Sequence, residues 1–400
     1  MTEVRFGLVG LGNIGKLHYR YFPNLEGAVL TAVCDIDPAR FEALDKNTAD
    51  FDHAVTTTTK EHKGKIERFR DYIEMLDSGL VDAVIIGVPH IFHPEMCIAA
   101  FERGIHVICE KPVAITAREA RLINEAYAKS SNVVFAAMFQ QRTKPCFIKI
   151  KELLNNGTLG EVRRINWIIT DWFRTQHYYN SGEWRGNWNG EGGGVLMNQC
   201  PHNLDLFQWF FGLPEELYAL GYLGKWHDIT VEDDISVLMK MSNGATASFI
   251  TSTADFPGTN RLEITAEKGK LVFEDNKLMF WPLEETVQSI IDTSNQGFYS
   301  KKVSMEEIPI EDNPHGHQYI TQNVVNTILG KEELIAPGVE GIKSVELANA
   351  MLYSMVRQKP VKFPVPEEEF DALLEELRAD ERKNKPEKAF IWEDYLAQLR

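Results

Sequence analysis

The pattern of apolar positions divides the chain into two parts that differ in period. Up to about residue 137, nearly continuous apolar runs alternate with segments in which apolar residues recur at helical spacing. The expected strands are near 4–9, 28–34, 81–87, 105–109 and 133–137, and the expected helices are near 13–22, 38–45, 71–78, 93–103 and 116–129. This alternation predicts an α/β fold, in which a doubly wound parallel sheet is covered by helices on both faces.

Beyond Phe139 the apolar period changes to two, which is typical of strands with one buried face. A helix is expected near 146–155, and Asn243-Gly244 indicates a hairpin between the runs 235–241 and 245–253. Further strands are expected near 261–266, 270–274 and 278–281, and closing helices near 319–329 and 344–358. We therefore predict a second α/β domain with an open, mostly antiparallel sheet.

The end of the chain has a different character. Prolines at 360, 364 and 366 mark the exit from the second domain, so that 365–400 forms a charged tail. Apolar residues at helical spacing in this tail are Phe370, Leu373, Leu374, Leu377, Trp392, Tyr395, Leu396 and Leu399. This spacing predicts helices, either docked on their own subunit or reaching a second one. A polar stretch at 46–65 is predicted to be a long loop.

Composition and charge narrow the class of protein. With 400 residues, 44% hydrophobic and 25% charged, the chain has the composition of a soluble globular protein. Its formal net charge of −16 argues against a nucleic-acid partner. We expect a cytoplasmic protein with no membrane partner, because no signal peptide or membrane-spanning run is recognisable. The five cysteines are widely spread, so neither disulfides nor a metal site is expected.

A glycine motif follows the first expected strand. Gly10, Gly12 and Gly15 form a Gly-x-Gly-x-x-Gly pattern, and Asn13 and Ile14 open the next expected helix. The glycines permit a tight turn, a close approach of a pyrophosphate to the backbone, and close packing of helix on strand. The helix N-terminus can then hold the phosphates. These five residues predict a dinucleotide site.

An acidic residue sharpens the identity of the dinucleotide. Asp35 lies at the end of the second strand, 20 positions after Gly15. Its carboxylate can accept hydrogen bonds from ribose hydroxyls and would repel a 2′-phosphate, which favours NAD over NADP as cofactor. Alternatively, Asp35 or Asp37 caps the helix that opens at Pro38.

Residues that follow the other strands are also candidates, because ligands of such sheets bind beyond the carboxyl ends of the strands. Pro89 and His93 follow the expected strand near 81–87 and could frame the nicotinamide ribose, although a simple helix start looks the same. Glu110, Lys111 and Pro112 follow the expected strand near 105–109. An ammonium group at this position can stabilise a developing alkoxide and bind a polar substrate.

The second half contributes one more candidate segment. Three glycines at 192–194 precede Asn198 and His202, and they would let the backbone approach a ligand. Pro201 is tolerated only in the first turn of a helix, which predicts a helix start near Asn198 and places Asn198 and His202 on one face. The imidazole could accept a proton while the amide orients a substrate. A purely structural histidine is the alternative.

Taken together, these four segments resemble the Gfo/Idh/MocA family of oxidoreductases, which includes glucose-fructose oxidoreductase and inositol dehydrogenase. The resemblance covers roughly residues 4–360. It implies an NAD-binding Rossmann domain over 1–137 and a substrate-binding and oligomerisation domain over 138–364, and hence a homodimer or homotetramer. It also implies that Lys111 and His202 flank the reacting hydroxyl, and that a cis peptide bond precedes Pro112.

One position departs from the family pattern. Many members carry Asp four residues before the histidine, whereas this chain carries Asn198, which can neither ionise nor accept a proton. We therefore expect His202 to take the proton, Lys111 to hold the alkoxide and Asn198 to orient the substrate. Asp205, one turn further on, could tune the imidazole or form a salt bridge elsewhere.

Aromatic and polar residues concentrated between 171 and 188 suggest a carbohydrate. Aromatic faces pack on the C–H surfaces of sugars, and polar side chains bind the hydroxyls. The candidate substrate contacts are Gln140, Arg142, Trp172, His177, Trp184 and Arg185. Taken singly, each aromatic residue could equally belong to the core.

These features predict an NAD-dependent dehydrogenase that oxidises a secondary hydroxyl of a sugar, glycoside or cyclitol by hydride transfer. Two alternatives remain: an NADP(H)-dependent keto-sugar reductase, and a non-catalytic, nucleotide-sensing regulator with the same fold. The presence of both Lys111 and His202 argues against the regulator.

Overall fold

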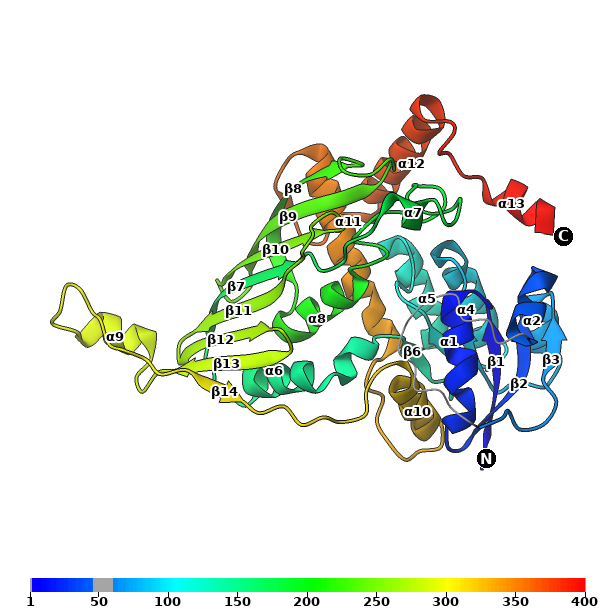
Figure 1. The fold of residues 1–400 in the computed structure, drawn as a ribbon, viewed down its shortest axis with the longest axis horizontal. Helices are drawn as coiled ribbons and strands as arrows, with labels where there is room; N and C mark the ends of the chain where they lie inside the picture. Colours follow the sequence, from blue (N-terminus) through cyan, green and yellow to red (C-terminus); the bar gives the residue numbers. More distant parts are fainter. Residues whose placement is uncertain (1, 46–59, 400) are drawn as a thin grey trace.

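The computed structural model describes residues 2–45 and 60–399 and contains two β-sheets, each with its own helices and hydrophobic core (Figure 1). Most of the loop predicted at 46–65 lies outside the described residues. Within the described ranges, no helix combines the length and the apolar character that a membrane crossing requires.

The first sheet is parallel, with six strands in the order β3-β2-β1-β4-β5-β6. Its strands are β1 (Val4–Val9), β2 (Ala28–Cys34), β3 (Glu67–Phe69), β4 (Ala83–Ile86), β5 (His106–Cys109) and β6 (Phe135–Ala137). Its helices are α1 (Asn13–Tyr21), α2 (Pro38–Asp45), α3 (Tyr72–Asp77), α4 (His93–Glu102) and α5 (Ala117–Lys129). The predicted doubly wound sheet is confirmed. Because β1 pairs with β2 on one side and β4 on the other, the strand order reverses beside the glycine turn, where such sheets bind ligands.

The second sheet has nine strands in the order β14-β13-β12-β11-β7-β10-β9-β8-β15. They are β7 (Val162–Ile169), β8 (Pro214–Leu223), β9 (Glu232–Met241), β10 (Thr246–Ser252), β11 (Asn260–Ala266), β12 (Gly269–Glu274), β13 (Lys277–Pro282), β14 (Glu306–Ile308) and β15 (Val361–Lys362). The pair β7 and β10 is parallel and the other pairs are antiparallel, so the predicted open, mostly antiparallel sheet is confirmed.

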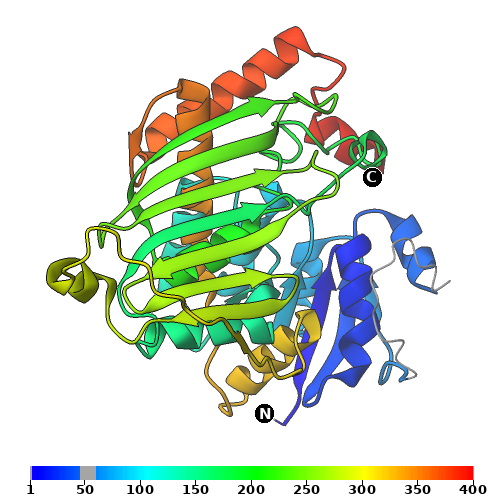
Figure 2. The ribbon, with the colours of Figure 1, turned by 60° about the vertical axis from the view of Figure 1, so that its left-hand side comes forward.

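Helices cover one face of the second sheet and leave the other open (Figure 2). The covering helices are α6 (Pro145–Asn155), α8 (Pro201–Phe211) and α11 (Gly341–Arg357). The short helices α7 (Gln176–Tyr179) and α9 (Val287–Thr293) lie in the loops between strands, α9 on a projecting arm (Figure 1). Leu220, Tyr222 and Leu238 on β8 and β9 are 58%, 55% and 64% exposed, so large apolar side chains reach solvent on this sheet.

Helix α10 (His317–Ile328) packs on a different core from the one that the sequence pattern suggests. The sequence predicts that this helix closes the second domain. In the structure, Ile320, Val324 and Val325 are buried in the core of the first sheet, and α10 contacts α1. Periodicity identifies the apolar face of a helix but not the partner of that face.

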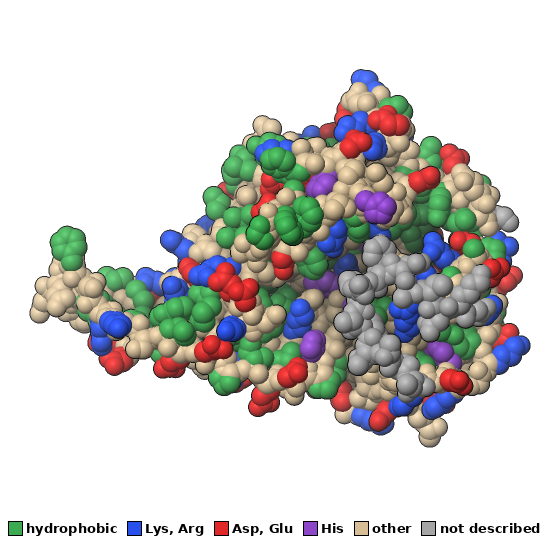
Figure 3. Space-filling model, viewed as in Figure 1, with side chains coloured by type: hydrophobic (Ala, Val, Ile, Leu, Met, Phe, Trp, Pro, Cys, Tyr) green, Lys and Arg blue, Asp and Glu red, His purple; other side chains and the backbone are tan. Residues whose placement is uncertain are grey.

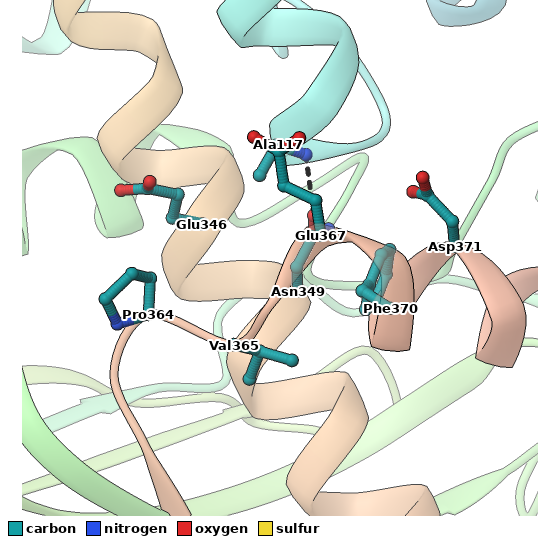
Figure 4. A pocket seen from close by; sticks show the side chains of 8 residues that line it. All are labelled: Ala117, Glu346, Asn349, Pro364, Val365, Glu367, Phe370 and Asp371. Atoms are coloured by element: carbon teal, nitrogen blue, oxygen red, sulfur yellow. Dashed lines mark hydrogen bonds between the residues drawn. The ribbon is translucent and has the colours of Figure 1, made fainter.

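The charged tail forms α12 (Glu367–Asn384) and α13 (Trp392–Leu399), which dock on the same chain. Arg121 of α5 forms an ion pair with Glu367 at 2.9 Å. A shallow pocket lies where α5, α11 and the start of α12 meet, and there the backbone amide of Ala117 donates to Asn349 Oδ1 at 2.9 Å (Figure 4). None of the eight residues that line this pocket is a predicted site residue.

Candidate active site

The glycine turn has the geometry that a phosphate site requires. Gly10 has φ +84°, a left-handed conformation that favours glycine. A Cβ on Gly15 would lie 1.9 Å from the carbonyl oxygen of Gly10, so α1 can pack this closely on the turn only without a side chain. A Cβ on Gly12 would meet no atom within 4 Å, which leaves open space at that backbone. The residues therefore fit a dinucleotide whose pyrophosphate approaches Gly12 and the start of α1 at Asn13 and Ile14.

Asp35 connects the second strand to this turn. Its Oδ2 accepts a hydrogen bond from the amide of Leu11 at 2.7 Å, and Oδ1 accepts from the amide of Asp37 at 2.9 Å. Asp37 in turn accepts from the amide of Ala39 at 2.9 Å and caps the start of α2. Capping is therefore the role of Asp37, and the carboxylate of Asp35 lies beside the glycine turn.

Lys111 extends from the end of β5 toward the second domain. Its Nζ donates to the carbonyl oxygen of Asn198 at 2.8 Å. Desolvation in the cleft lowers the pKa of Lys111, and the nearby carboxylates of Glu110 and Glu191 oppose that shift. The peptide bond between Lys111 and Pro112 is cis, as the family resemblance implies.

Glu110 belongs to a buried hydrogen-bonded chain that the sequence patterns do not reveal. His18 Nε2 lies 2.9 Å from Glu110 Oε1, and His18 Nδ1 contacts the hydroxyl of Tyr21. That hydroxyl lies 2.7 Å from Thr321 Oγ1. Burial alone would raise the pKa of Glu110, but the His18 hydrogen bond and neighbouring positive charges lower it to about 2. Glu110 is therefore a buried anion held by α1 rather than a side chain open to the cleft.

Two histidines, His90 and His93, follow β4 and differ in their contacts. His93, a predicted cofactor contact, is 0% exposed, and its ring nitrogens lie 2.8 Å and 2.9 Å from the carbonyl oxygens of Pro112 and Val88. This ring therefore joins the segments that follow β4 and β5, and its contact with a ribose stays a prediction. Pro89 precedes the turn that contains His90, whose buried Nδ1 has no hydrogen-bond partner among the described residues.

His202 lies in the first turn of α8 and is 6% exposed. Its Nε2 lies 3.0 Å from Nε2 of Gln140, and its buried Nδ1 has no partner within the described part of the chain. Burial first, and then the nearby charge of Lys111, hold the pKa of His202 well below its usual value. The imidazole is therefore neutral near pH 7. Because the side-chain amino group of Gln140 donates to Nε2, Nε2 is the ring nitrogen with the lone pair and Nδ1 carries the proton.

Asn198 lies outside the helix, which corrects the predicted helix start. Helix α8 begins at Pro201, so Asn198 and His202 are not one turn apart on a helical face. The amide nitrogen of Asn198 donates to Glu191 and lies 3.3 Å from the hydroxyl of Tyr178. Both ends of Asn198 are therefore held, the backbone by Lys111 and the side chain by Glu191.

The glycines before Asn198 approach protein rather than open space. A Cβ on Gly192 would lie 2.5 Å from the side chain of Ile115, and one on Gly194 would lie 1.9 Å from the carbonyl oxygen of Glu232. The carboxylate of Glu232 also accepts from the amides of Gly194 and Leu196 at 2.9 Å and 3.0 Å. The glycines therefore allow this segment to pack between the two domains, which differs from the expected approach to a ligand.

Arg142 and Asp205 form a buried ion pair. Arg142 is 2% exposed; its Nη2 lies 2.7 Å from Asp205 Oδ1 and its Nη1 lies 2.6 Å from Glu340 Oε2. Two carboxylates thus occupy the guanidinium, and a contact between Arg142 and a substrate stays a prediction. Asp205 forms a salt bridge and does not tune His202.

The aromatic segment gathers around Tyr178. The guanidinium of Arg185 lies 4.6 Å from the Tyr178 ring centroid and 4.4 Å from that of Trp184, and Arg185 Nη1 donates to the Tyr178 hydroxyl at 2.7 Å. Trp172 is partly buried and its Nε1 donates to Asn203 Oδ1 at 3.3 Å. His177 is exposed on α7. Trp184 and Arg185 thus adjoin the hydrogen-bonded group around Asn198, whereas the position of His177 supplies no evidence of a role.

Unsatisfied polar atoms gather where these segments meet. Within the described residues, six buried side-chain nitrogen or oxygen atoms have no partner, and four of them belong to His90, Gln140, Gln199 and His202. Buried polar groups are normally hydrogen-bonded, so such a cluster indicates groups kept for a ligand. Figure 3 shows histidine and basic side chains near a hollow on this face of the molecule.

Three residues of this site escaped the sequence patterns: Glu191, Tyr178 and His18. Glu191 stands directly before the triple glycine and Tyr178 lies within the aromatic segment, so the position of each in the sequence is a signal for the site. His18 offered no signal, because it is a lone histidine on the buried face of α1.

Two family models match the chain. One, described as an oxidoreductase family with an NAD-binding Rossmann fold, matches residues 4–138, and the other, a GFO/IDH/MocA C-terminal domain, matches residues 147–272. Among similar proteins, a myo-inositol 2-dehydrogenase of Thermotoga maritima is 26% identical over 68% of this chain and 75% of its own length. A levoglucosan dehydrogenase of Pseudarthrobacter phenanthrenivorans is 26% identical over 68% of this chain and 74% of its own.

Solved structures agree with these matches. The WlbA dehydrogenase from Bordetella pertussis, in complex with NADH and UDP-GlcNAcA, is 25% identical, with a TM-score of 0.74 over 91% of this chain and 100% of that one. A levoglucosan dehydrogenase in complex with NADH and L-sorbose shares the fold, with a TM-score of 0.73 at 18% identity over 92% of this chain and 100% of that one. The chain therefore belongs to the Gfo/Idh/MocA family of oxidoreductases, and its N-terminal part is an NAD-binding Rossmann domain.

Proposed function

We propose that this protein is an NAD-dependent dehydrogenase that oxidises a secondary hydroxyl of a sugar, glycoside or cyclitol. The observation that carries the proposal is the meeting of Lys111 with the segment that bears Asn198 and His202, where His202 keeps a buried ring nitrogen unpartnered among the described residues. A cation and a neutral imidazole in one partly dry cleft form the pair that alcohol oxidation requires.

The residues of the glycine turn fit the cofactor. Gly10, Gly12 and Gly15, with the start of α1, would hold the pyrophosphate, and Asp35 would bind the adenosine ribose. A bound nicotinamide would supply the acceptor for the hydride that leaves the substrate carbon.

His202 would accept the proton of the reacting hydroxyl at Nε2, after the substrate hydroxyl displaces the Gln140 amino group from that nitrogen. A general base must be deprotonated before it acts, and the lowered pKa of His202 keeps the imidazole neutral near pH 7. Lys111 would stabilise the negative charge that develops on the oxygen as the proton leaves. Asn198, held between Lys111 and Glu191, would orient the substrate by accepting a hydrogen bond from a neighbouring hydroxyl at Oδ1.

Three observations favour a polyhydroxylated substrate. Trp184, Arg185 and Tyr178 combine aromatic faces with hydrogen-bonding groups beside Asn198. Gln140 and Gln199 keep buried amide oxygens without partners in the described residues. The names of the similar proteins, inositol and levoglucosan dehydrogenases, support the same class.

A substrate panel tests this proposal. Purified protein is incubated with NAD or NADP and with inositols, free sugars and glycosides, while the absorbance of the reduced nicotinamide is recorded. We expect reduction of NAD with at least one polyol, and loss of that signal in Lys111→Met. Reduction of keto-sugars with NADPH alone would support the reductase alternative, and absence of turnover with every substrate, despite NAD binding, would support a regulator.

We also propose that the protein is a cytoplasmic homodimer or homotetramer that associates through the open face of the nine-stranded sheet. The exposed Leu220, Tyr222 and Leu238 favour such an interface. Light scattering after size-exclusion chromatography tests it, because Leu238→Glu should produce monomers if this face is buried between subunits.

A further inference from the structure

Glu191 is a buried carboxylate to which the mechanism above gives no chemical role. It is 1% exposed, and its Oε2 accepts a hydrogen bond from the amide of Gly186 at 2.8 Å. Its Oε1 accepts from Asn198 Nδ2, and Arg185 Nη1 lies 3.6 Å from the same oxygen. Desolvation of a carboxylate is costly, so this arrangement needs compensating partners. Two of these partners, Asn198 and Arg185, are candidate substrate contacts.

This contact determines which way the Asn198 amide points. Burial raises the pKa of Glu191, and Arg185, the amide of Gly186, Asn198 and Lys111 oppose that shift. In its ionised form the carboxylate only accepts hydrogen bonds, so Asn198 presents its amino group to Glu191. The carbonyl oxygen Oδ1 is consequently turned away from Glu191. With a neutral amide in place of Glu191, either orientation of Asn198 would form a hydrogen bond, and the direction of Oδ1 would no longer be fixed.

The same carboxylate balances the charge of Lys111. Glu110 and Glu191 are the carboxylates that favour charged Lys111, whereas Arg185 and Arg174 oppose it. Glu110 already holds His18 at 2.9 Å. Glu191 is therefore the carboxylate on the second domain's side that compensates the ammonium group.

Resting on the proposed function, we propose that Glu191 is a positioning residue of the dehydrogenase. It fixes Asn198 so that Oδ1 faces the substrate hydroxyls. It also supplies negative charge beside Lys111. Many family members carry Asp at the position of Asn198, and Glu191 is the hydrogen-bond partner of Asn198 in this chain. The negative charge that Asp would carry at position 198 is thus carried by Glu191 in this protein.

Exchanging the two groups tests the positioning role. In Glu191→Gln, Asn198 loses its fixed orientation, and we expect kcat/KM to fall roughly 10- to 100-fold, the size of a hydrogen bond to a charged group. In Asn198→Asp, two carboxylates meet, and we expect a similar loss. The double variant restores one amide donating to one carboxylate, so it should recover activity above both single variants. A double variant no better than the weaker single variant, or Glu191→Gln with unchanged kcat/KM, would overturn the proposal.

A second measurement needs no substrate. Lys111 is partly exposed, so its labelling by an amine-reactive reagent can be followed against pH by peptide mass spectrometry. Removal of the Glu191 charge should lower the pKa of Lys111 further and shift its labelling midpoint to lower pH. Glu191→Asp, which keeps the charge, should restore the midpoint. Asp82→Asn is a matched control, because Asp82 pairs with Arg5 at the opposite end of the strands and should leave the midpoint unchanged.

The two measurements separate this inference from the proposed function. If the wild-type protein oxidises no polyol, the proposed function fails, while a shifted midpoint still assigns Glu191 to Lys111. If the wild type is active but Glu191→Gln matches it in both activity and midpoint, only the inference about Glu191 fails. Thermal unfolding of each variant verifies that it is folded.

Discussion

The cofactor side and the substrate side of the cleft are built in opposite ways. The cofactor side consists of the ends of adjacent strands and one glycine turn, and its key contacts lie within residues 9–39. The substrate side is assembled from segments far apart in sequence: Lys111 reaches Asn198, and Arg142 pairs with Asp205 and Glu340. A local motif can therefore be recognised alone, whereas the substrate side depends on the packing of two domains.

The largest expected effect concerns the proposed chemistry on the substrate side. His202→Ala should lower kcat roughly 10²- to 10⁴-fold, the usual contribution of a general base, while NAD binding changes little. Steady-state kinetics together with calorimetric titration of NAD separate the two effects. His315→Ala, on an exposed loop, is the control. Unchanged kcat would remove His202 from the mechanism.

The next largest effect tests whether the substrate side depends on distant partners. Arg142→Ala leaves Asp205 as a buried, uncompensated carboxylate and should destabilise the fold by about 3–5 kcal/mol. Chemical denaturation measures this loss. If the variant is as stable as wild type but has a raised KM for substrate, the result would indicate that Arg142 contacts the substrate.

A pair of glycine variants separates folding from cofactor binding on the other side. Gly15→Ala places a Cβ 1.9 Å from a backbone oxygen, and we expect a stability loss of about 1–3 kcal/mol. Gly12→Ala meets nothing within 4 Å, so the melting temperature should hold while NAD affinity falls. Equal effects of both variants on stability would contradict the role given to Gly12.

The pH dependence of stability tests the hydrogen bonds by which Glu232 holds the triple-glycine segment. Burial raises the pKa of Glu232 from 4.5 to about 7, so the folded state retains this proton at a pH where the unfolded state has released it. The stability contribution is present below pH 4.5 and is lost as the pH rises through about 7. The stability of wild type relative to Glu232→Gln should therefore fall across this interval. Parallel melting curves across the interval would show that Glu232 does not titrate there.

The smallest expected effect concerns the choice of cofactor. Asp35→Ser removes an acceptor for the ribose hydroxyls and the charge that disfavours a 2′-phosphate. We expect the KM for NAD to rise roughly 2- to 10-fold, as for one lost hydrogen bond, and the KM for NADP to fall. Unchanged ratios of kcat/KM for the two cofactors would contradict the role of Asp35.

This contrast also explains which features the sequence could predict. The bounds of β1 and β2 agree with the expected strands, because their apolar pattern is local. The sequence predicts a helix start near Asn198, whereas α8 begins at Pro201, because a proline fits several positions of a first turn. The partner of Arg142 lies 63 residues further along the chain, and no local pattern reveals it. The position of Glu191 before the triple glycine is visible in the sequence, but its contacts with Asn198 and Arg185 arise only in the folded chain.

Transfer of a labelled hydride tests the central claim most directly. A polyol substrate from the panel, carrying deuterium on its reacting carbon, is incubated with NAD and protein, and the reduced nicotinamide is analysed by mass spectrometry. We expect deuterium in the nicotinamide with wild type, and its strong reduction in Lys111→Met and His202→Ala. Deuterium released to solvent without reduced nicotinamide, or equal transfer by both variants, would contradict a dehydrogenase that works through this pair.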